Sequence, residues 1–355
     1  MPSVLVAMSG GVDSSVAACL LQEQGYDVLG SHMRLVHLDG VDHGCCGPTA
    51  RGDAEAVARI AGFPFEICDL TEDFDRSVLA DFAAEHEAGR TPNPCARCNG
   101  EIKFGAFLRR ADELGVDLVA TGHYVRRAAG ERGWRLLRGL DRAKDQSYML
   151  HMLGQRALAR SLFPVGELEK SETRALAERF GLPVAGKPDS QELCFAPAGD
   201  AAAYARANLA HLVRPGEVVD PDGTVLGRHD GVFAFTVGQR RGTGVAVGER
   251  RYVVDVDPSA NLVVVGPSEL LGRSGLVADR WSWVADGPFA GGPFEAEVRI
   301  RYRGDDVACV AEPLGPDRVR VEFRSPQRAV APGQSAVLFR GDEVLGGGRI
   351  VETFR

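Results

Sequence analysis

A short glycine loop joining an apolar strand pattern to a helix pattern is the feature that most constrains the fold of this chain. Residues 4–8 are apolar, residues 9–15 read Ser-Gly-Gly-Val-Asp-Ser-Ser, and a helical pattern follows from Ser14 to Gln24. Glycine lets the backbone turn tightly and approach a ligand, and the N–H groups at the start of a helix bind anions. Because open parallel sheets bind ligands where their strands end, the loop predicts a phosphate site in an α/β fold.

Alternating strand and helix patterns continue to about residue 199. Asp53 is expected to cap a helix that ends at Gly62. The other strand patterns cover residues 27–31, 65–68 and 117–121, and the other helical patterns cover residues 72–88, 101–114 and 170–180. This alternation predicts a parallel sheet with helices on both faces.

The pattern changes near residue 200, where short β-type runs separated by Gly and Pro replace the alternation. Such runs are typical of a small barrel. Trp281 and Trp283 are expected in its core. We therefore predict three domains: a nucleotide-binding and catalytic α/β domain over 1–199, a small central β-rich domain over 200–271, and a C-terminal β-barrel over 272–355.

Composition narrows the class of protein. The net charge of −8 argues against a protein that simply coats nucleic acid, although a local basic face can still bind RNA. The start of the chain lacks the basic region and apolar core of a signal peptide. No apolar run is long enough to span a membrane. These features predict a cytoplasmic protein that does not enter the membrane.

The eight cysteines indicate metal binding or redox chemistry, because a reducing cytosol does not favour a disulfide framework. Cys95 and Cys98 follow Thr-Pro-Asn-Pro, and the prolines predict an extended approach to the helix near Glu101. Proximity to a helix start and to Arg97 favours a thiolate. Cys194 follows the polar residues 189–192, which favours a reactive thiol over a buried one.

A Cys-x-x-Cys pair alone is compatible with half a zinc site, a redox pair or cluster ligands. A closed zinc site needs four ligands, and a second such pair is lacking, although His43, Cys45 and Cys46 could contribute. We predict no resident metal on the protein itself.

Taken in order, these strings resemble the MnmA-type tRNA 2-thiouridylases over essentially the whole chain. The glycine loop resembles the pyrophosphatase loop (PP-loop, SGGxDS) of enzymes that split ATP between its α- and β-phosphates. Further matching strings are Gly-Arg-Thr-Pro-Asn-Pro at 89–94, Ala-Thr-Gly-His-Tyr at 120–124, Lys-Asp-Gln-Ser-Tyr at 144–148 and Gly-Gln-Arg at 238–240. The implied fold is that of the adenine-nucleotide alpha-hydrolases.

The resemblance implies two groups of binding residues. ATP, with Mg²⁺ acting near Asp13, would be bound by Ala7, Met8, Ser9, Gly10, Gly11, Val12, Asp13, Ser14, Met33 and Gly122. The tRNA would be contacted by Asn93, Pro94, Cys95, His123, Lys144, Asp145, Gln146, Arg301, Tyr302 and Gln334. Arg299, Arg301 and Arg303 alternate, so on a strand they would share one face, with Tyr302 on the other.

The resemblance also implies a mechanism. ATP would adenylate the C2 oxygen of the wobble uridine, a persulfide on Cys194 would supply sulfur, and Cys98 would release the product by forming a disulfide with Cys194. A persulfide-donating relay protein or cysteine desulfurase and a thiol reductant would be partners. Some family members have an aspartate, proposed as a base, at the position of Cys95. Here Cys95 could be a relay thiol, a base or a bystander.

Three alternatives remain at this point. Cys95, Cys98 and Cys194 could together hold an iron–sulfur cluster, which we favour less than the persulfide route. The chain could be another PP-loop ligase or amidotransferase, which would not need the thiols. It could also be a zinc-bound RNA-binding module without catalysis.

Overall fold

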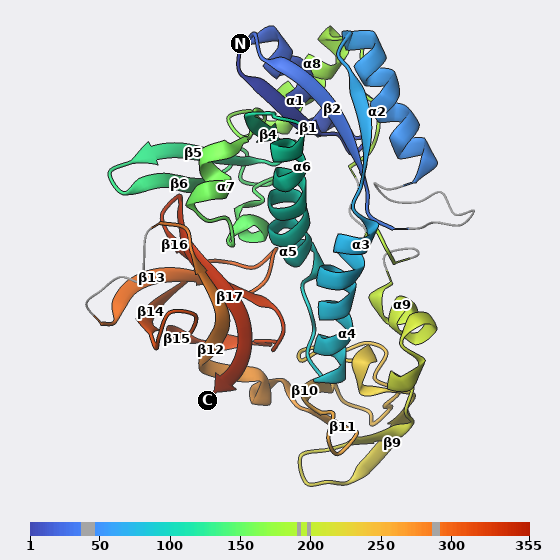
Figure 1. The fold of residues 1–355 in the computed structure, drawn as a ribbon. Coiled ribbons are helices and arrows are strands. Elements are labelled where there is room, and N and C mark those ends of the chain that lie inside the picture. The colour runs from blue at the N-terminus through green and yellow to red at the C-terminus, as the bar shows by residue number, and fades with distance from the viewer. Residues whose placement is uncertain (37–46, 190–192, 197–199, 286–291) are drawn as a thin grey trace.

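The computed structural model describes residues 1–36, 47–189, 193–196, 200–285 and 292–355. Three parts are visible (Figure 1): an α/β part at the top, a β-barrel at the lower left and a small sheet at the lower right. In the described residues, no helix is long and apolar enough to cross a membrane.

The α/β part is built on a parallel sheet in the order β3-β2-β1-β4-β7. Its strands are β1 (Ser3–Ala7), β2 (Asp27–Arg34), β3 (Phe65–Asp69), β4 (Leu118–Ala120) and β7 (Ser161–Leu162). Side chains alternate across a strand, and both faces of β1 are buried. Val4 and Val6 pack into one apolar cluster, whereas Leu5 and Ala7 pack into another.

Helices cover both faces of this sheet, as predicted. Residues of α1 (Val12–Glu23), α2 (Pro48–Ala61) and α8 (Lys170–Arg179) join the cluster of Val4. Residues of α6 (Phe107–Glu113) and α7 (Gln155–Arg160) join the cluster of Leu5. Other helical segments in the described residues before the barrel include α3 (Thr71–Phe74), η2 (Asp75–Leu79), α4 (Ala80–Glu87), η4 (Ser147–Leu150), α9 (Ala201–Asn208), η6 (Ala210–Leu212) and η7 (Val232–Ala234).

Two expected helix starts are wrong. Helix α2 begins at Pro48 after Gly47, so Asp53 lies inside it and pairs with Lys187 (2.6 Å) instead of capping it. Gly62 does end this helix, with a left-handed φ of 80°. Pro at the first helical position supplied the true start signal.

The helix expected near residue 101 begins earlier, at α5 (Pro94–Cys98), and continues through the π-helical η3 (Asn99–Ala106) into α6. Asn93 caps it, because its side chain accepts a hydrogen bond from the Ala96 N–H (3.2 Å). Cys95 and Cys98 therefore lie on the helix itself and not on an extended loop.

The middle part is a four-stranded sheet in the order β10-β11-β8-β9. Its strands are β8 (Gly216–Val219), β9 (Val225–His229), β10 (Tyr252–Asp257) and β11 (Leu262–Gly266). The pairs β8–β9 and β10–β11 are antiparallel, and β11 joins them through a parallel pairing with β8.

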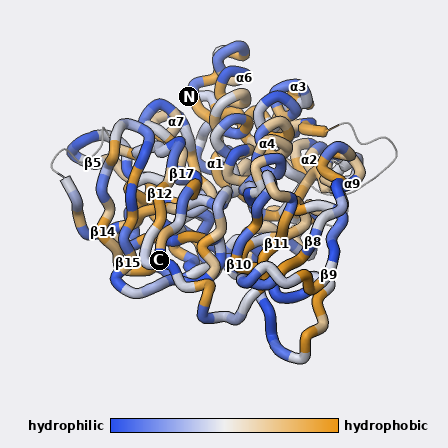
Figure 2. The backbone as a smooth tube through the Cα atoms, turned by 90° about the horizontal axis from the view of Figure 1, so that it is seen from below, coloured by the Kyte–Doolittle hydropathy of each residue, from blue (hydrophilic) through white to orange (hydrophobic). Residues whose placement is uncertain are grey.

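The C-terminal part is a barrel, as predicted, with strand order β12-β15-β14-β13-β16-β17 and closure between β17 and β12. Apolar and hydrophilic segments alternate along its strands in Figure 2. Trp281 is buried in it and Trp283 is half-buried. Its elements are η8 (Ser268–Leu271), β12 (Gly272–Trp283), β13 (Phe294–Arg299), β14 (Val307–Pro313), β15 (Val319–Arg328), β16 (Ser335–Arg340) and β17 (Glu343–Phe354).

The expected row of alternating arginines is wrong. Strand β13 ends at Arg299, whose guanidinium is largely buried and bonded to Asp306 (2.9 Å). Arg301 and Tyr302 lie in the turn that follows, where the alternation of a strand no longer applies.

A hairpin of the α/β part extends the sheet of the barrel. Strands β5 (Val125–Gly130) and β6 (Gly133–Arg138) pair with each other, and β6 pairs with β17 through Leu136↔Val344 and Leu137↔Glu343. The expected boundaries at 199/200 and 271/272 therefore remain predictions, because part of the first segment belongs to the last sheet.

Candidate active site

The glycine loop forms a tight cradle between β1 and α1. Gly10 has a left-handed φ of 70°, and a Cβ built there would lie 2.1 Å from the Ala50 carbonyl oxygen. The Ser9 N–H donates to Ser14 Oγ (3.2 Å), and the Ser15 hydroxyl donates to the Gly11 carbonyl (2.8 Å). Only glycine fits this conformation and this space, which explains the residue type.

The residues expected around the nucleotide come together at the ends of β1, β2 and β4. Gly122, just after β4, lies against the start of α1, because a Cβ there would be 2.5 Å from Ser14 N and 2.6 Å from Asp13 C. Ala7 and Met8 are buried at the end of β1, and Met33 is half-buried on β2. The chain therefore brings three strand ends to one loop.

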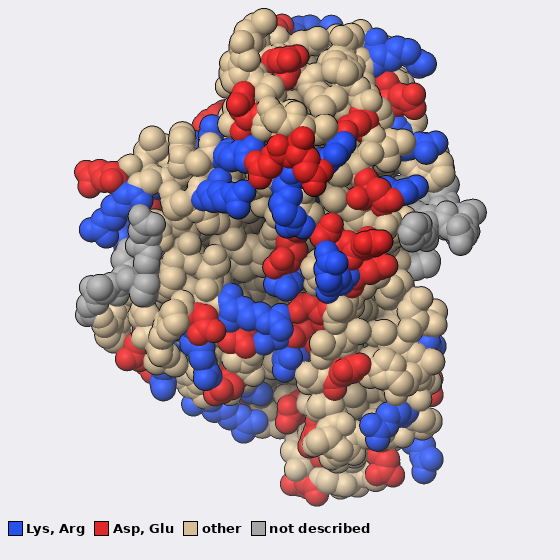
Figure 3. Space-filling view, in the orientation of Figure 1, with Lys and Arg blue, Asp and Glu red and all other residues tan. Residues whose placement is uncertain are grey.

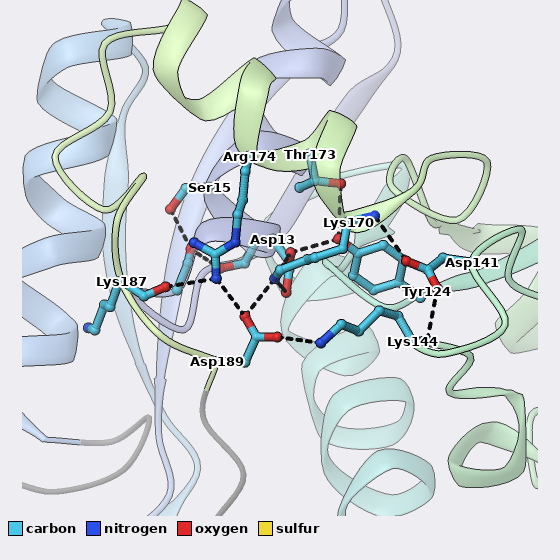
Figure 4. Close-up of polar contacts among 12 residues, drawn as sticks. Asp13, Ser15, Tyr124, Asp141, Lys144, Lys170, Thr173, Arg174, Lys187 and Asp189 are labelled. Atoms are coloured by element: carbon cyan, nitrogen blue, oxygen red, sulfur yellow. Dashed lines mark hydrogen bonds and ion pairs between the residues drawn. The ribbon is translucent and has the colours of Figure 1, made fainter.

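A cluster of charged side chains lies over the loop (Figure 4). Lys170, the first residue of α8, places its Nζ 2.7 and 2.8 Å from the two carboxylate oxygens of Asp13 and 2.7 Å from Asp189. Tyr124 Oη lies 2.9 Å from Asp13 Oδ1. The carboxylate beside the anion cradle is thus neutralised by a protein cation.

Asp189 is held by two further cations, Lys144 (2.9 Å) and Arg174 (3.3 Å). Burial opposes its ionisation, but the bonds to Lys170 and Lys144 outweigh that effect and hold the pKa of Asp189 below its ordinary value. The bond to Asp189 in turn raises the pKa of Lys144.

Lys187 adds another positive charge at the cradle. Its ammonium donates to the Gly10 carbonyl (3.0 Å) and to Asp53 (2.6 Å). Four cations facing three carboxylates beside a glycine loop can bind a polyphosphate, whose oxygens accept charge-assisted hydrogen bonds. Sequence reasoning missed Lys170, Arg174 and Lys187, because they reach the loop from positions far along the chain.

The three candidate cysteines differ in exposure. Cys95 is exposed, Cys98 is 7% exposed and Cys194 is half-buried. Cys98 belongs to the same apolar cluster against which Cys194 packs. Phe195 fixes the segment of Cys194, since its ring lies 5.3 Å from that of Phe82 and 4.8 Å from that of Tyr204.

The segment before Cys95 is bound by both other parts of the molecule. Thr91 donates its N–H to the Pro332 carbonyl of the barrel (2.9 Å), and its hydroxyl lies 3.0 Å from that of Thr236 in the middle part. The Gln334 amide donates to the carbonyls of Thr91 (3.0 Å) and Pro92 (3.2 Å). The barrel and the middle part therefore position the helix that carries the cysteines.

Comparison with known proteins decides the family. Residues 2–198 match the family model described as the tRNA methyl transferase HUP domain. Residues 209–267 match the tRNA methyl transferase PRC-barrel domain, and residues 273–350 match the aminomethyltransferase beta-barrel domain. The tRNA-specific 2-thiouridylase MnmA of Geobacter metallireducens is 47% identical, over 98% of this chain and 96% of that protein. The chain belongs to the MnmA family.

Two further similarities accompany this match. The tRNA-specific 2-thiouridylase MnmA of Salinibacter ruber is 48% identical over 98% of this chain and 94% of that protein. Among solved structures, a 4-thiouridine synthetase–RNA complex with bound ATP is similar over 53% of this chain and 43% of that one. The two share 17% sequence identity, with a TM-score of 0.35.

Several residues that the MnmA resemblance assigned to tRNA are used inside the protein. Asp145 is buried and accepts hydrogen bonds from the N–H groups of Gly139 and Ser147 (both 3.1 Å). The Gln146 side chain accepts from the Tyr124 N–H (2.9 Å). Gln334 holds the segment before Cys95. These side chains position the site, and their contact with RNA remains a prediction.

His123 is also buried, and its Nδ1 lies 2.7 Å from Thr121 Oγ1. Burial lowers the pKa of His123 well below its ordinary value, and the charge of Lys103 adds to this. The expected contact of this enclosed imidazole with tRNA remains a prediction.

Tyr302 brings the barrel close to the cysteine helix. Its ring packs against Tyr148 (6.2 Å between centroids), and burial raises the pKa of its phenol, with smaller contributions from Asp145 and Cys95. Arg301 is exposed beside it. The turn after β13 and the start of α5 therefore border one region, which also includes Lys144.

The described residues contain no group of three or more His, Cys, Asp or Glu placed to hold a metal ion. The possible zinc ligands His43, Cys45 and Cys46 lie outside the described residues.

Proposed function

We propose that this protein thiolates C2 of the wobble uridine of tRNA, using ATP to activate the base and a cysteine persulfide to supply sulfur. The main support for the proposal is that a residue of the ATP-activating site and the cysteine that would carry sulfur are close together in the sequence. Asp189, held over the glycine loop by Lys170, Lys144 and Arg174, precedes Cys194 by only five positions in the sequence. The phosphate site and the reactive thiol thus belong to one segment.

Activation solves a chemical problem, because the C2 carbonyl of uracil is a poor electrophile and its oxygen a poor leaving group. The C2 oxygen would attack the α-phosphorus of ATP, and pyrophosphate would leave. Lys170, Lys144 and Arg174 would neutralise the charge that develops on the phosphates. The glycine loop would hold the phosphate oxygens through its N–H groups.

Mg²⁺ is expected to accompany ATP, since this ion is commonly bound through phosphate oxygens and one or two carboxylates. Asp13 is the carboxylate beside the loop, and it would first have to leave Lys170. No step proposed here depends on the ion.

Sulfur transfer would follow in two balanced steps. The terminal sulfur of a Cys194 persulfide attacks C2, and AMP leaves with the former C2 oxygen. The Cys98 thiolate then attacks Cys194 Sγ, a Cys98–Cys194 disulfide forms, and the electron pair of the broken S–S bond passes to the sulfur now on C2. A persulfide-donating protein would reload Cys194, and a dithiol would reduce the disulfide.

The test is thiolation of a tRNA transcript by purified protein with ATP, cysteine desulfurase and cysteine. The C194S variant, which cannot form the persulfide, should release pyrophosphate but no AMP when tRNA is added. The C98S variant should release AMP in a single turnover and then stop at the mixed disulfide, and neither variant should form free 2-thiouridine. C309S, which alters a cysteine buried in the barrel, serves as the control.

Retained thiolation in C98S or C194S would contradict the proposed roles of these cysteines. AMP release by wild-type protein without tRNA, and no formation of 2-thiouridine, would favour a PP-loop ligase that does not use the thiols. Stoichiometric zinc in the purified protein, with no AMP release, would instead favour an RNA-binding module without catalysis.

A further inference from the structure

Cys95 and Cys98 lie one turn apart on the same helix. Both belong to α5, where Pro94 is the first helical residue and Asn93 the cap. Helix geometry places Cα atoms three residues apart at roughly 5 Å, which falls within the range that a disulfide spans. The two thiols can therefore be joined with little movement of the backbone.

The three cysteines differ in how accessible they are to a second protein. Cys98 is buried in the apolar cluster, and Cys194 is half-buried beside Phe195, whose ring is enclosed by Phe82 and Tyr204. Cys95 is exposed. Thiol–disulfide exchange requires access to the sulfur that is attacked. A Cys98–Cys194 disulfide would thus be poorly accessible to a protein reductant.

We propose that Cys95 is a relay thiol that transfers this disulfide to the surface, an inference that rests on the function proposed above. The Cys95 thiolate attacks Cys98 Sγ, a Cys95–Cys98 bond forms, and the Cys98–Cys194 bond breaks with its electron pair passing to Cys194. An external dithiol then attacks the exposed Cys95 Sγ, becomes oxidised, and restores both cysteines of α5.

The position of Cys95 suits this role. It occupies the first turn of a helix that continues through η3 and α6, and the N–H groups of a first turn stabilise a thiolate. The relay also separates two events, because Cys194 is ready for a new persulfide before the reductant arrives. A carboxylate at position 95 could not form the intermediate disulfide.

The relay can be tested by trapping its intermediate. Persulfide-loaded enzyme is mixed with tRNA and ATP in the absence of a reductant, quenched with acid, alkylated and mapped by peptide mass spectrometry. The wild-type protein should contain a Cys95–Cys98 disulfide and an alkylated Cys194. C95S should instead contain a Cys98–Cys194 disulfide.

Turnover provides the second readout. With thioredoxin and thioredoxin reductase as the dithiol source, C95S should form about one equivalent of 2-thiouridine. It should then turn over at least ~10-fold more slowly than wild type, because the buried disulfide is attacked slowly. C95D should behave like C95S, whereas a base at this position predicts that C95D retains wild-type turnover.

Two results overturn different parts of this scheme. A Cys98–Cys194 disulfide in wild-type protein with Cys95 alkylated, together with normal turnover of C95S, would refute the relay and leave the proposed function intact. The absence of any disulfide, with thiolation surviving in C98S, would refute the Cys98–Cys194 chemistry of the proposed function.

Discussion

The close approach of Gly122 to the glycine loop gives a sharp test of the nucleotide site. In Gly122→Ala the new methyl group would lie 2.5 Å from Ser14 N, whereas ordinary contact begins near 3.4 Å. The end of β4 and the start of α1 would have to separate by about 0.9 Å. Because both neighbours are backbone atoms, no flexible side chain can absorb the overlap.

The expected effect on nucleotide use is comparable in size to that on stability, and the two can be measured separately. Overpacking typically costs about 1–3 kcal/mol of folding free energy, whereas a misplacement of about 1 Å at a reacting site costs about 100-fold in rate. If ATP binding weakens by the same factor, an ATP concentration of about 100 times the wild-type Kd stabilises wild type by about 2.7 kcal/mol but G122A by only about 0.4 kcal/mol.

The assay is thermal unfolding with and without ATP, combined with the ATP dependence of tRNA-stimulated AMP release. Gly52→Ala is the matched control, because Gly52 lies exposed within α2 and open space surrounds the position that its new methyl group would take. That variant should keep its ATP response and gain about 0.5–1 kcal/mol of stability. A wild-type ATP response in G122A would refute the reasoning.

Three further predictions follow from single contacts. Lys170→Gln should raise the KM for ATP at least ~10-fold, because it leaves Asp13 and Asp189 facing each other without their shared cation. K170R should recover part of this loss. An unchanged KM in Lys170→Gln would contradict the proposed role of Lys170 in ATP binding. Asn93→Ala should remove the cap of α5, lowering the free energy of unfolding by about 1 kcal/mol in urea titrations, whereas N93D should retain the cap; equal stability of both variants would exclude a capping role. Burial lowers the pKa of His86 to about 4, from an ordinary 6.5, so the unfolded chain binds more protons between these values and stability falls as the pH drops from 6.5 towards 4. His86→Phe should reduce this loss between pH 7 and pH 5, and an unchanged pH dependence would contradict the assignment.

Local patterns predicted the features that depend on neighbouring residues. The glycine loop could be predicted because its strand, its two glycines and the start of its helix lie within a few residues of one another. The start of α2 was misassigned because Asp53 satisfies a capping rule equally well inside the helix, where it pairs with Lys187. Asn93 and Pro94 did contain the true start of α5, but two prolines also fit an extended segment.

Features that depend on distant residues could not be predicted in this way. Lys170 reaches Asp13 across 157 positions, and nothing near Lys170 in the sequence marks it as a phosphate ligand. The arginine row failed because alternation indicates a shared face only while the strand continues, and β13 ends at Arg299. Lys and Arg side chains lie among Asp and Glu over the face in Figure 3, so charge composition alone also does not locate an RNA surface.

The pairing of β6 with β17 has a consequence for how the chain is made. Arg126 of β5 bonds to Asp342, 216 positions later, and Leu136 lies beside Val344. Until β17 has been synthesised, β6 of the hairpin presents an unpaired strand edge, and such edges promote aggregation. Contacts this distant in sequence also slow folding. The α/β part should therefore reach its native state late, and chaperone dependence during synthesis should decrease only once β17 has emerged from the ribosome.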